Sequence, residues 1–173
     1  MTDKILVIAL GGTIASVRKQ SITLGENPAR VIDCYKGEDV EFVSISPFAI
    51  LSENITRANW QALINCLEQT DFEKYKGVII LHGSDTLAYT SSIIANAFFD
   101  KNIVLTASDK PIDESNSNGI RNFCTAVKHI KSGENGVFVS YDGIFKANCI
   151  TSADINDRFF ALESTVSPTG KRK

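Results

Sequence analysis

Short apolar runs alternate with segments of helical period along this chain, and that alternation constrains the fold more than any other feature. The runs are rich in β-branched residues and are bounded by polar residues or glycine, which is typical of strands buried on both faces. Strands separated by helices require crossover connections, so the pattern predicts a three-layer α/β fold with a mostly parallel sheet flanked by helices. The expected strands are 5–10, 40–45, 77–81, 102–106 and 136–141, with 144–150 as a hairpin partner, and the expected helices are 57–68, 86–99 and 119–131.

The rest of the chain divides simply. With 173 residues there is room for one domain with a full core. We expect that domain to span residues 1–163 and to be followed by a polar, basic, frayed tail at 164–173. Residues 15–38 are polar and glycine-containing, so we expect a loop there with one short helix near 29–35.

Charge and composition exclude several classes of protein. Eighteen basic and twenty acidic residues leave a net charge of −2, which gives no electrostatic footprint for nucleic acid or for an anionic membrane. The longest early apolar run, 5–10, is too short for a signal peptide or a membrane span. Four widely spaced cysteines form no metal or redox motif, which indicates reduced thiols. We therefore expect a cytoplasmic protein.

Three polar clusters follow predicted strands, at 11–13, 82–86 and 106–109. Because ligands of parallel sheets bind beyond the carboxyl ends of the strands, the clusters predict a site at that edge. The paired glycines before Thr13 favour a tight turn, and its hydroxyl is either a nucleophile or part of a plain turn. Ser84 and Asp85 precede a helix, where they either bind an amino-acid ligand or cap the helix.

The remaining polar residues carry weaker signals. Ser52 precedes a predicted helix and by itself indicates a cap, and His82 by itself indicates a hydrogen-bonded core residue. No set of His, Cys, Asp and Glu has the spacing of metal ligands, so we expect neither a metal nor another cofactor.

Two motifs give the chain a resemblance to a known family. ILVIALGGTIAS at 5–16 and GVIILHGSDTLAYTSS at 77–92 resemble the two motifs of the bacterial-type L-asparaginases, which read TGGTI and HGTDT. The similarity continues through LSENITRANW, VLTASDKP and SNGIRN, in the same order along the chain. It covers most of residues 4–160 and implies the fold of that family's N-terminal domain.

The resemblance also implies roles for individual residues. Thr13 matches the nucleophilic threonine, Ser84 the second catalytic hydroxyl, and Asp85 the aspartate that contacts the substrate's α-amino group. Ser52 matches the serine that binds the α-carboxylate. The residues implied to bind substrate are Ser52, Glu53, Ala107 and Ser108.

The departures from the family pattern affect the expected activity. Leu10 replaces a threonine, and the chain has about half the family's usual length, without the C-terminal domain that completes each active site in a neighbouring subunit. Ser152 aligns with the catalytic lysine and has no amine to act as a base. Lys146 is too far along the chain to replace it, and Lys110 borders the same edge but is more simply interpreted as a solvated side chain.

Three hypotheses for function follow. The chain is an asparaginase-like amidohydrolase that converts asparagine to aspartate and ammonia; or it is a catalytically impaired domain that still binds an amino acid; or it is a half-site subunit that needs a partner chain. Because the family buries surface against its second domain, we also expect a homodimer or larger assembly.

Overall fold

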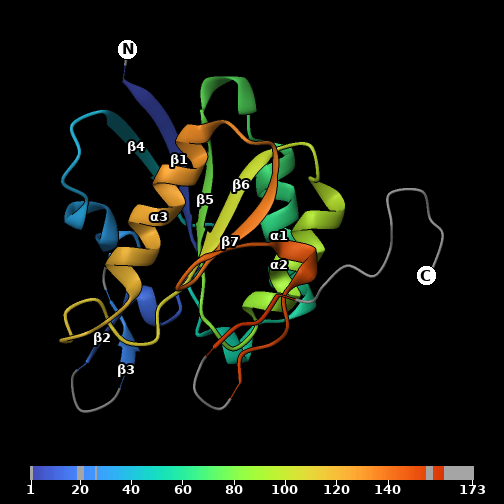
Figure 1. Ribbon diagram of the computed structural model, residues 1–173. Helices are drawn as coiled ribbons and strands as arrows, with labels where there is room; N and C mark the ends of the chain where they lie inside the picture. The colour runs from blue at the N-terminus through green and yellow to red at the C-terminus, as the bar shows by residue number, and fades with distance from the viewer. Residues whose placement is uncertain (1, 19–21, 26, 155–157, 162–173) are drawn as a thin grey trace.

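The computed structural model describes residues 2–18, 22–25, 27–154 and 158–161 (Figure 1). Six strands form one sheet in the order β4-β1-β5-β6-β7-β8, and only the β7–β8 pair is antiparallel. These strands are β1 (Asp3–Ala9), β4 (Val40–Ile45), β5 (Gly77–Leu81), β6 (Asn102–Thr106), β7 (Gly136–Ser140) and β8 (Ile144–Lys146). The predicted α/β architecture with a mostly parallel sheet is confirmed.

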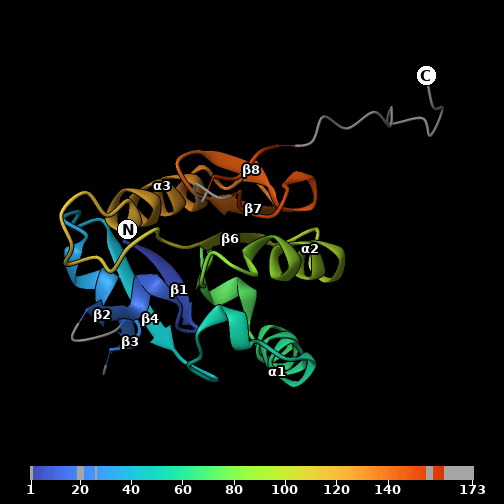
Figure 2. The same cartoon turned by 90° about the horizontal axis from the view of Figure 1, so that it is seen from below.

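Helices cover both faces of the sheet (Figures 1 and 2). Helices α1 (Arg57–Glu68) and α2 (Leu87–Ala97) pack on one face, and α3 (Gly119–Ser132) packs on the other with the 3₁₀ turn η2 (Arg30–Cys34). Successive side chains of a strand point to opposite faces, so β1 supplies Leu6 and Ile8 to the α1–α2 core and Ile5 and Val7 to the α3 core.

The ends of the helices follow local sequence. The amide oxygen of Asn59 accepts hydrogen bonds from the backbone N–H and the hydroxyl of Thr56, and this fixes the start of α1. Helix α3 ends at Gly133, whose φ of 74° is the left-handed conformation that glycine adopts without strain. In the described part of the chain, no helix is both long enough and apolar enough to span a bilayer.

Two segments differ from the sequence-based prediction. A small antiparallel hairpin, β2 (Ser16–Arg18) and β3 (Ile22–Leu24), interrupts the loop expected at 15–38. It was not predicted, because three-residue strands are too short to show a periodic pattern. The hairpin partner expected at 144–150 ends at Lys146. Ala147 and Ile150 are buried in the α1–α2 core, so the chain leaves the sheet as the short 3₁₀ turn η5 (Ala147–Cys149). The tail predicted at 164–173 lies outside the described residues.

Phe123 tests how much of the stability depends on the α3 face. This fully buried ring packs 5.6 Å from the ring of Phe42. We expect Phe123→Ala to lower the free energy of unfolding by about 3–5 kcal/mol, because the lost contacts leave a cavity. Phe99 is 75% exposed, so Phe99→Ala should change it by less than about 0.5 kcal/mol. Urea unfolding measures both, and equal losses would contradict this account of the core.

Candidate functional site

The loops that follow β1, β5 and β6 stay in contact beyond the ends of the strands. The N–H of Leu10 donates to the carbonyl of Leu81 at 3.0 Å, and the N–H of His82 donates to the carbonyl of Thr106 at 2.9 Å. The N–H of Gly12 donates to the carbonyl of Ile50 at 3.0 Å, which brings in the loop after β4. Four loops therefore meet at the carboxyl edge of the parallel strands.

Two glycines allow these loops to touch backbone to backbone. Gly12 has a φ of 76°, and a Cβ placed on it would lie 2.5 Å from the Cα of Gly83. A Cβ placed on Gly83 would lie 2.6 Å from the Cβ of Ser52. Any larger residue would push the loops apart, because real Cβ atoms do not approach other atoms so closely.

Ser52 and Asp85 are joined directly at this edge. The Ser52 hydroxyl donates to Oδ2 of Asp85 at 2.9 Å, across 33 positions of sequence. The hydroxyl of Thr86 donates to the carbonyl of Ser52 at 3.0 Å. Ser52 is 3% exposed, whereas Asp85 is exposed. The buried serine hydroxyl therefore holds the Asp85 carboxylate at a position that solvent reaches.

Thr13 and Ser84 flank the glycine contact. Thr13 is half-buried and opens the 3₁₀ turn η1 (Thr13–Ala15), which closes when the Ala15 N–H and the Ser16 hydroxyl donate to the Gly12 carbonyl at 3.1 and 2.8 Å. Ser84 is buried, and its carbonyl accepts the N–H of Leu87 at the start of α2. Thr13, Ser52, Ser84 and Asp85 thus lie on loops that contact one another.

The other predicted substrate-binding residues are placed differently. Glu53 is exposed, in the 3₁₀ turn η3 (Ser52–Asn54). Ala107 and Ser108 are fully buried: the Ala107 carbonyl accepts the side-chain N–H of Asn122, and the Ser108 hydroxyl donates to the Lys110 carbonyl. The Ala107 side chain lies in the α1–α2 core, and Ser108 lies against Gly119 at the start of α3, so their role in binding a substrate stays a prediction.

The structure shows where Ser152 and Lys110 lie relative to Asp85. Ser152, at the position of the family's lysine, is exposed beside the first turn of α2, where its hydroxyl lies 3.5 Å from that of Tyr89. Lys110 is exposed. Within the described ranges, no lysine nitrogen lies within 4.0 Å of the Asp85 carboxylate. The source of a base is therefore not found among these lysines.

His82 is buried as the sequence suggested, and it fixes the loop after β5. Its Nδ1 lies 2.7 Å from the carbonyl of Gly83, whereas its Nε2 is buried without a hydrogen-bond partner. Burial disfavours the charged ring and lowers the pKa of His82. The neutral ring with its proton on Nδ1 therefore donates to Gly83.

A polar network that sequence reasoning missed shapes the loop after β6. Asp109 and Asn118 exchange two hydrogen bonds, each from a backbone N–H to a side-chain oxygen, at 2.9 and 3.0 Å. Asn118 also donates to Asp142 at 3.1 Å, and Asp142 pairs with Arg121. Asp109 and Asn118 stand in the segments VLTASDKP and SNGIRN, which carry the family resemblance, but their mutual hydrogen bonds depend on how the two segments fold together and were not predicted.

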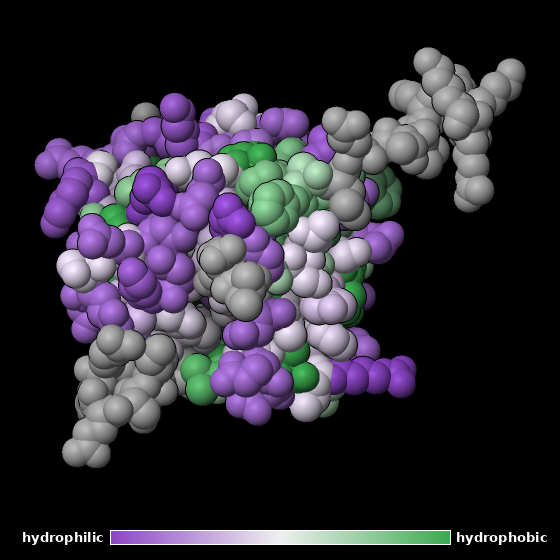
Figure 3. Space-filling view, turned by 60° about the horizontal axis from the view of Figure 1, so that its bottom comes forward, coloured by the Kyte–Doolittle hydropathy of each residue, from purple (hydrophilic) through white to green (hydrophobic). Residues whose placement is uncertain are grey.

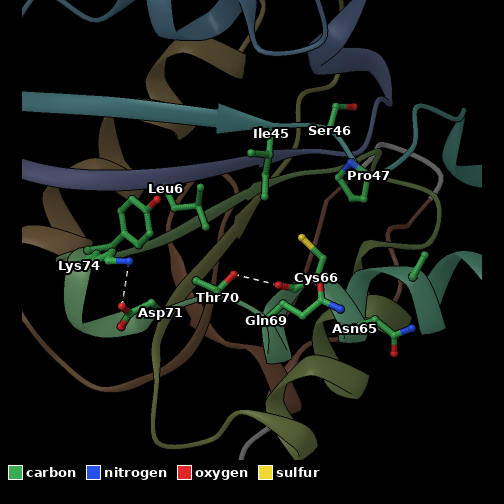
Figure 4. A pocket seen from close by; sticks show the side chains of 12 residues that line it. Leu6, Ile45, Ser46, Pro47, Asn65, Cys66, Gln69, Thr70, Asp71 and Lys74 are labelled. Carbon is green, nitrogen blue, oxygen red and sulfur yellow. Dashed lines mark hydrogen bonds and ion pairs between the residues drawn. The ribbon is translucent and has the colours of Figure 1, made fainter.

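One groove in the described part of the chain lies away from this edge. A groove of about 690 Å³ lies between the end of β4 and helix α1, with Ile45 and Pro47 on one side and Cys66 and Gln69 on the other (Figure 4). It contains none of the predicted site residues. On the face that Figure 3 shows, hydrophilic side chains prevail and hydrophobic ones appear in separate groups. Among the described residues, no group of three or more His, Cys, Asp or Glu side chains is arranged to hold a metal ion.

Comparison with known proteins assigns the chain to a family. Residues 4–167 match the family model described as "Asparaginase, N-terminal". The chain belongs to the asparaginase family. Its sequence is 32% identical over 145 residues to the L-asparaginase of Thermococcus kodakarensis, and the match covers 80% of this chain and 44% of that protein. This confirms the resemblance noted from the two glycine-containing motifs.

Other relatives are subunits of glutamyl-tRNA(Gln) amidotransferases. A glutamyl-tRNA(Gln) amidotransferase subunit of Aeropyrum pernix is 27% identical over 135 residues, which cover 72% of this chain and 31% of that protein. The chain thus matches less than half the length of these curated relatives.

Solved structures agree on the fold. The thermostable L-asparaginase from Thermococcus kodakarensis superposes with a TM-score of 0.78 at 28% identity, covering 91% of this chain and 51% of that one. L-asparaginase I from Vibrio cholerae gives a TM-score of 0.81 at 22% identity, covering 93% and 52%, and shows the shared fold.

The glycine contact predicts a strong effect of one methyl group. We expect Gly12→Ala to lower the free energy of unfolding by about 3 kcal/mol or more, because a positive φ and a blocked backbone contact act together. Gly133 is the matched control. Its φ of 74° is close to that of Gly12, but a Cβ there meets only the end of the Lys76 side chain, at 3.8 Å. Gly133→Ala should therefore cost only about 1 kcal/mol. Thermal unfolding compares them, and equal costs would show that the contact with Gly83 is unimportant.

The buried His82 predicts a pH dependence of stability. Because the pKa of His82 is lowered in the folded chain, the unfolded chain binds the additional proton below the ordinary value of 6.5. The contribution of the neutral ring is present above that pH and is lost as the pH falls below it. Asn offers a similar donor but does not titrate, so we expect His82→Asn to reduce the loss of stability between about pH 7.5 and 5.5. An unchanged slope in urea unfolding would contradict this assignment.

Proposed function

We propose that this chain binds an α-amino acid at the edge formed by Ser52 and Asp85 and contributes the nucleophile of an asparaginase-type amide hydrolysis. The observation that carries the proposal is the Ser52–Asp85 hydrogen bond of 2.9 Å beside the Gly12–Gly83 contact. An exposed carboxylate suits a substrate ammonium, and the adjacent serine hydroxyl suits a substrate carboxylate.

Binding exchanges one hydrogen bond for two. The Ser52 hydroxyl carries a single proton, which it donates to Asp85 in the ligand-free chain. When the Ser52 hydroxyl donates its hydrogen bond to a substrate carboxylate instead, Asp85 loses a donor, and the substrate ammonium replaces it. A ligand that carries only one of the two charged groups leaves one side chain unsatisfied, so this arrangement favours the complete amino acid.

The proposed chemistry is acyl transfer. The Thr13 hydroxyl attacks the side-chain amide carbon and gives up its proton, the C–N bond breaks, and the nitrogen leaves as ammonia after it receives that proton. Water then cleaves the resulting ester, which returns the hydroxyl and releases aspartate when the substrate is asparagine. Backbone N–H groups at the glycine contact and at the start of α2 are the proposed donors to the oxyanion.

We infer that turnover by this chain alone is weak. Ser152 supplies no amine, and loss of a general base typically costs about 10²–10⁴ in rate. A second candidate is therefore a half-site that a partner completes. The relatives named as subunits of an amidotransferase favour this alternative, as do the exposed side chains of Tyr89, Phe99 and Phe160. We propose that the catalytically active form is a homodimer or a larger assembly.

An ammonia-release assay with asparagine and glutamine tests the proposal. We expect slow release, well below a typical enzyme rate of about 10 s⁻¹, and its complete loss in Thr13→Ala. Thr125→Ala is the control, because that threonine lies on the exposed side of α3 and donates only to Arg121. Light scattering on the active fraction gives its mass. Release that persists in Thr13→Ala would exclude this nucleophile.

Calorimetry with aspartate tests binding separately. We expect Asp85→Asn to weaken binding at least about tenfold, since the amide keeps the size of the side chain but not its charge. Asp100→Asn is the matched control, because Asp100 pairs with Lys101 at the other end of α2. If both variants bind aspartate as tightly as the unchanged chain, Asp85 does not hold the ammonium.

A further inference from the structure

Thr86 stands where a helix cap is expected, but its hydroxyl points elsewhere. It is the residue before α2, and no side-chain hydrogen bond caps that helix. Its hydroxyl instead donates to the carbonyl of Ser52 at 3.0 Å, across 34 positions of sequence. A threonine at this position usually caps its own helix. Here its hydroxyl bonds the loop that contains Ser52 instead.

The Ser52 carbonyl has a second donor. The N–H of Ile55 donates to it at 3.2 Å, which closes the η3 turn. The hydroxyl of the same serine donates to Asp85. Two adjacent residues, Asp85 and Thr86, therefore hold the side chain and the main chain of Ser52, and together they determine where its hydroxyl lies.

A separate hydrogen bond secures the packing of the two helices. One turn further along α2, the hydroxyl of Thr90 accepts the indole N–H of Trp60 from α1 at 2.9 Å. Thr90 is fully buried. This bond ties α1 to α2 directly, whereas the Thr86 hydroxyl contacts the Ser52 main chain.

We propose that Thr86 is a positioning residue, which holds the Ser52 main chain so that the Ser52 hydroxyl stays aligned with Asp85 and with the carboxylate of an amino-acid ligand. This inference rests on the proposed function for its effect on binding. Its effect on the ligand-free chain does not depend on any ligand. Thr86 itself touches no reacting atom.

Two conservative substitutions of Thr86 test the inference. Thr86→Val keeps the shape but removes the hydroxyl, and Thr86→Ser keeps the hydroxyl. We expect aspartate binding, measured by calorimetry, to weaken about tenfold in Thr86→Val and to stay within about twofold in Thr86→Ser. Thr90→Val is the control: it should lower the melting temperature but leave aspartate affinity unchanged.

Hydrogen exchange provides a readout without ligand. In Thr86→Val we expect faster exchange of the Ile55 amide, which shares the Ser52 carbonyl, and unchanged exchange in the strands. If the valine variant does not fold, Thr86→Ala replaces it in both measurements.

The outcomes separate the two proposals. Unchanged Ile55 exchange together with unchanged affinity in Thr86→Val would overturn the positioning role, and so would an equal loss of affinity in Thr90→Val. If the unchanged chain binds no aspartate, the proposed function fails, and the Ile55 exchange still decides whether Thr86 holds Ser52.

Discussion

The close approach of Gly12 and Gly83 is the constraint on which the candidate site depends. The ends of β1 and β5 meet there without side chains between them, and Ser52 packs against the second glycine. Three loops are thereby held within hydrogen-bond distance of each other, although they are separated by more than 30 residues of sequence. The polar contacts between Ser52, Asp85 and Thr86 are possible only because the backbones first come this close.

The strands of the sheet core were predictable because of how they are buried. β4, β5 and β6 have the predicted bounds, since apolar runs between glycine and polar residues mark strands covered on both faces. The predicted bounds of α1, 57–68, also agree with the structure. The β2–β3 hairpin was not predictable, because its strands are too short for a periodic pattern. The turn η5 depends on contacts of Ala147 with a distant helix, and local sequence does not encode them.

The site was predictable in part for a related reason. Thr13, Ser84 and Asp85 lie in motifs next to strands, so a pattern of a few residues placed them at the carboxyl edge of the parallel strands. By contrast, the partner of the Ser52 hydroxyl depends on how two loops fold against each other, and the same is true of the redirected Thr86 hydroxyl. The burial of Ala107 in the α1–α2 core and of Ser108 at the start of α3 depends on tertiary packing, which single positions do not reveal.

The strand order has a consequence for how the chain reaches this structure. β1 precedes both of its partners along the chain, yet it lies between β4 and β5 and pairs with both. Its partner β4 ends at Ile45 and its other partner β5 ends at Leu81, so β1 is covered along both edges only when these distant segments have come together. Pairing across such separations is slow compared with local helix formation. Helix α1 can therefore form from local contacts, whereas the edge that joins Gly12 to Gly83 requires the long-range pairing of β1 with β5.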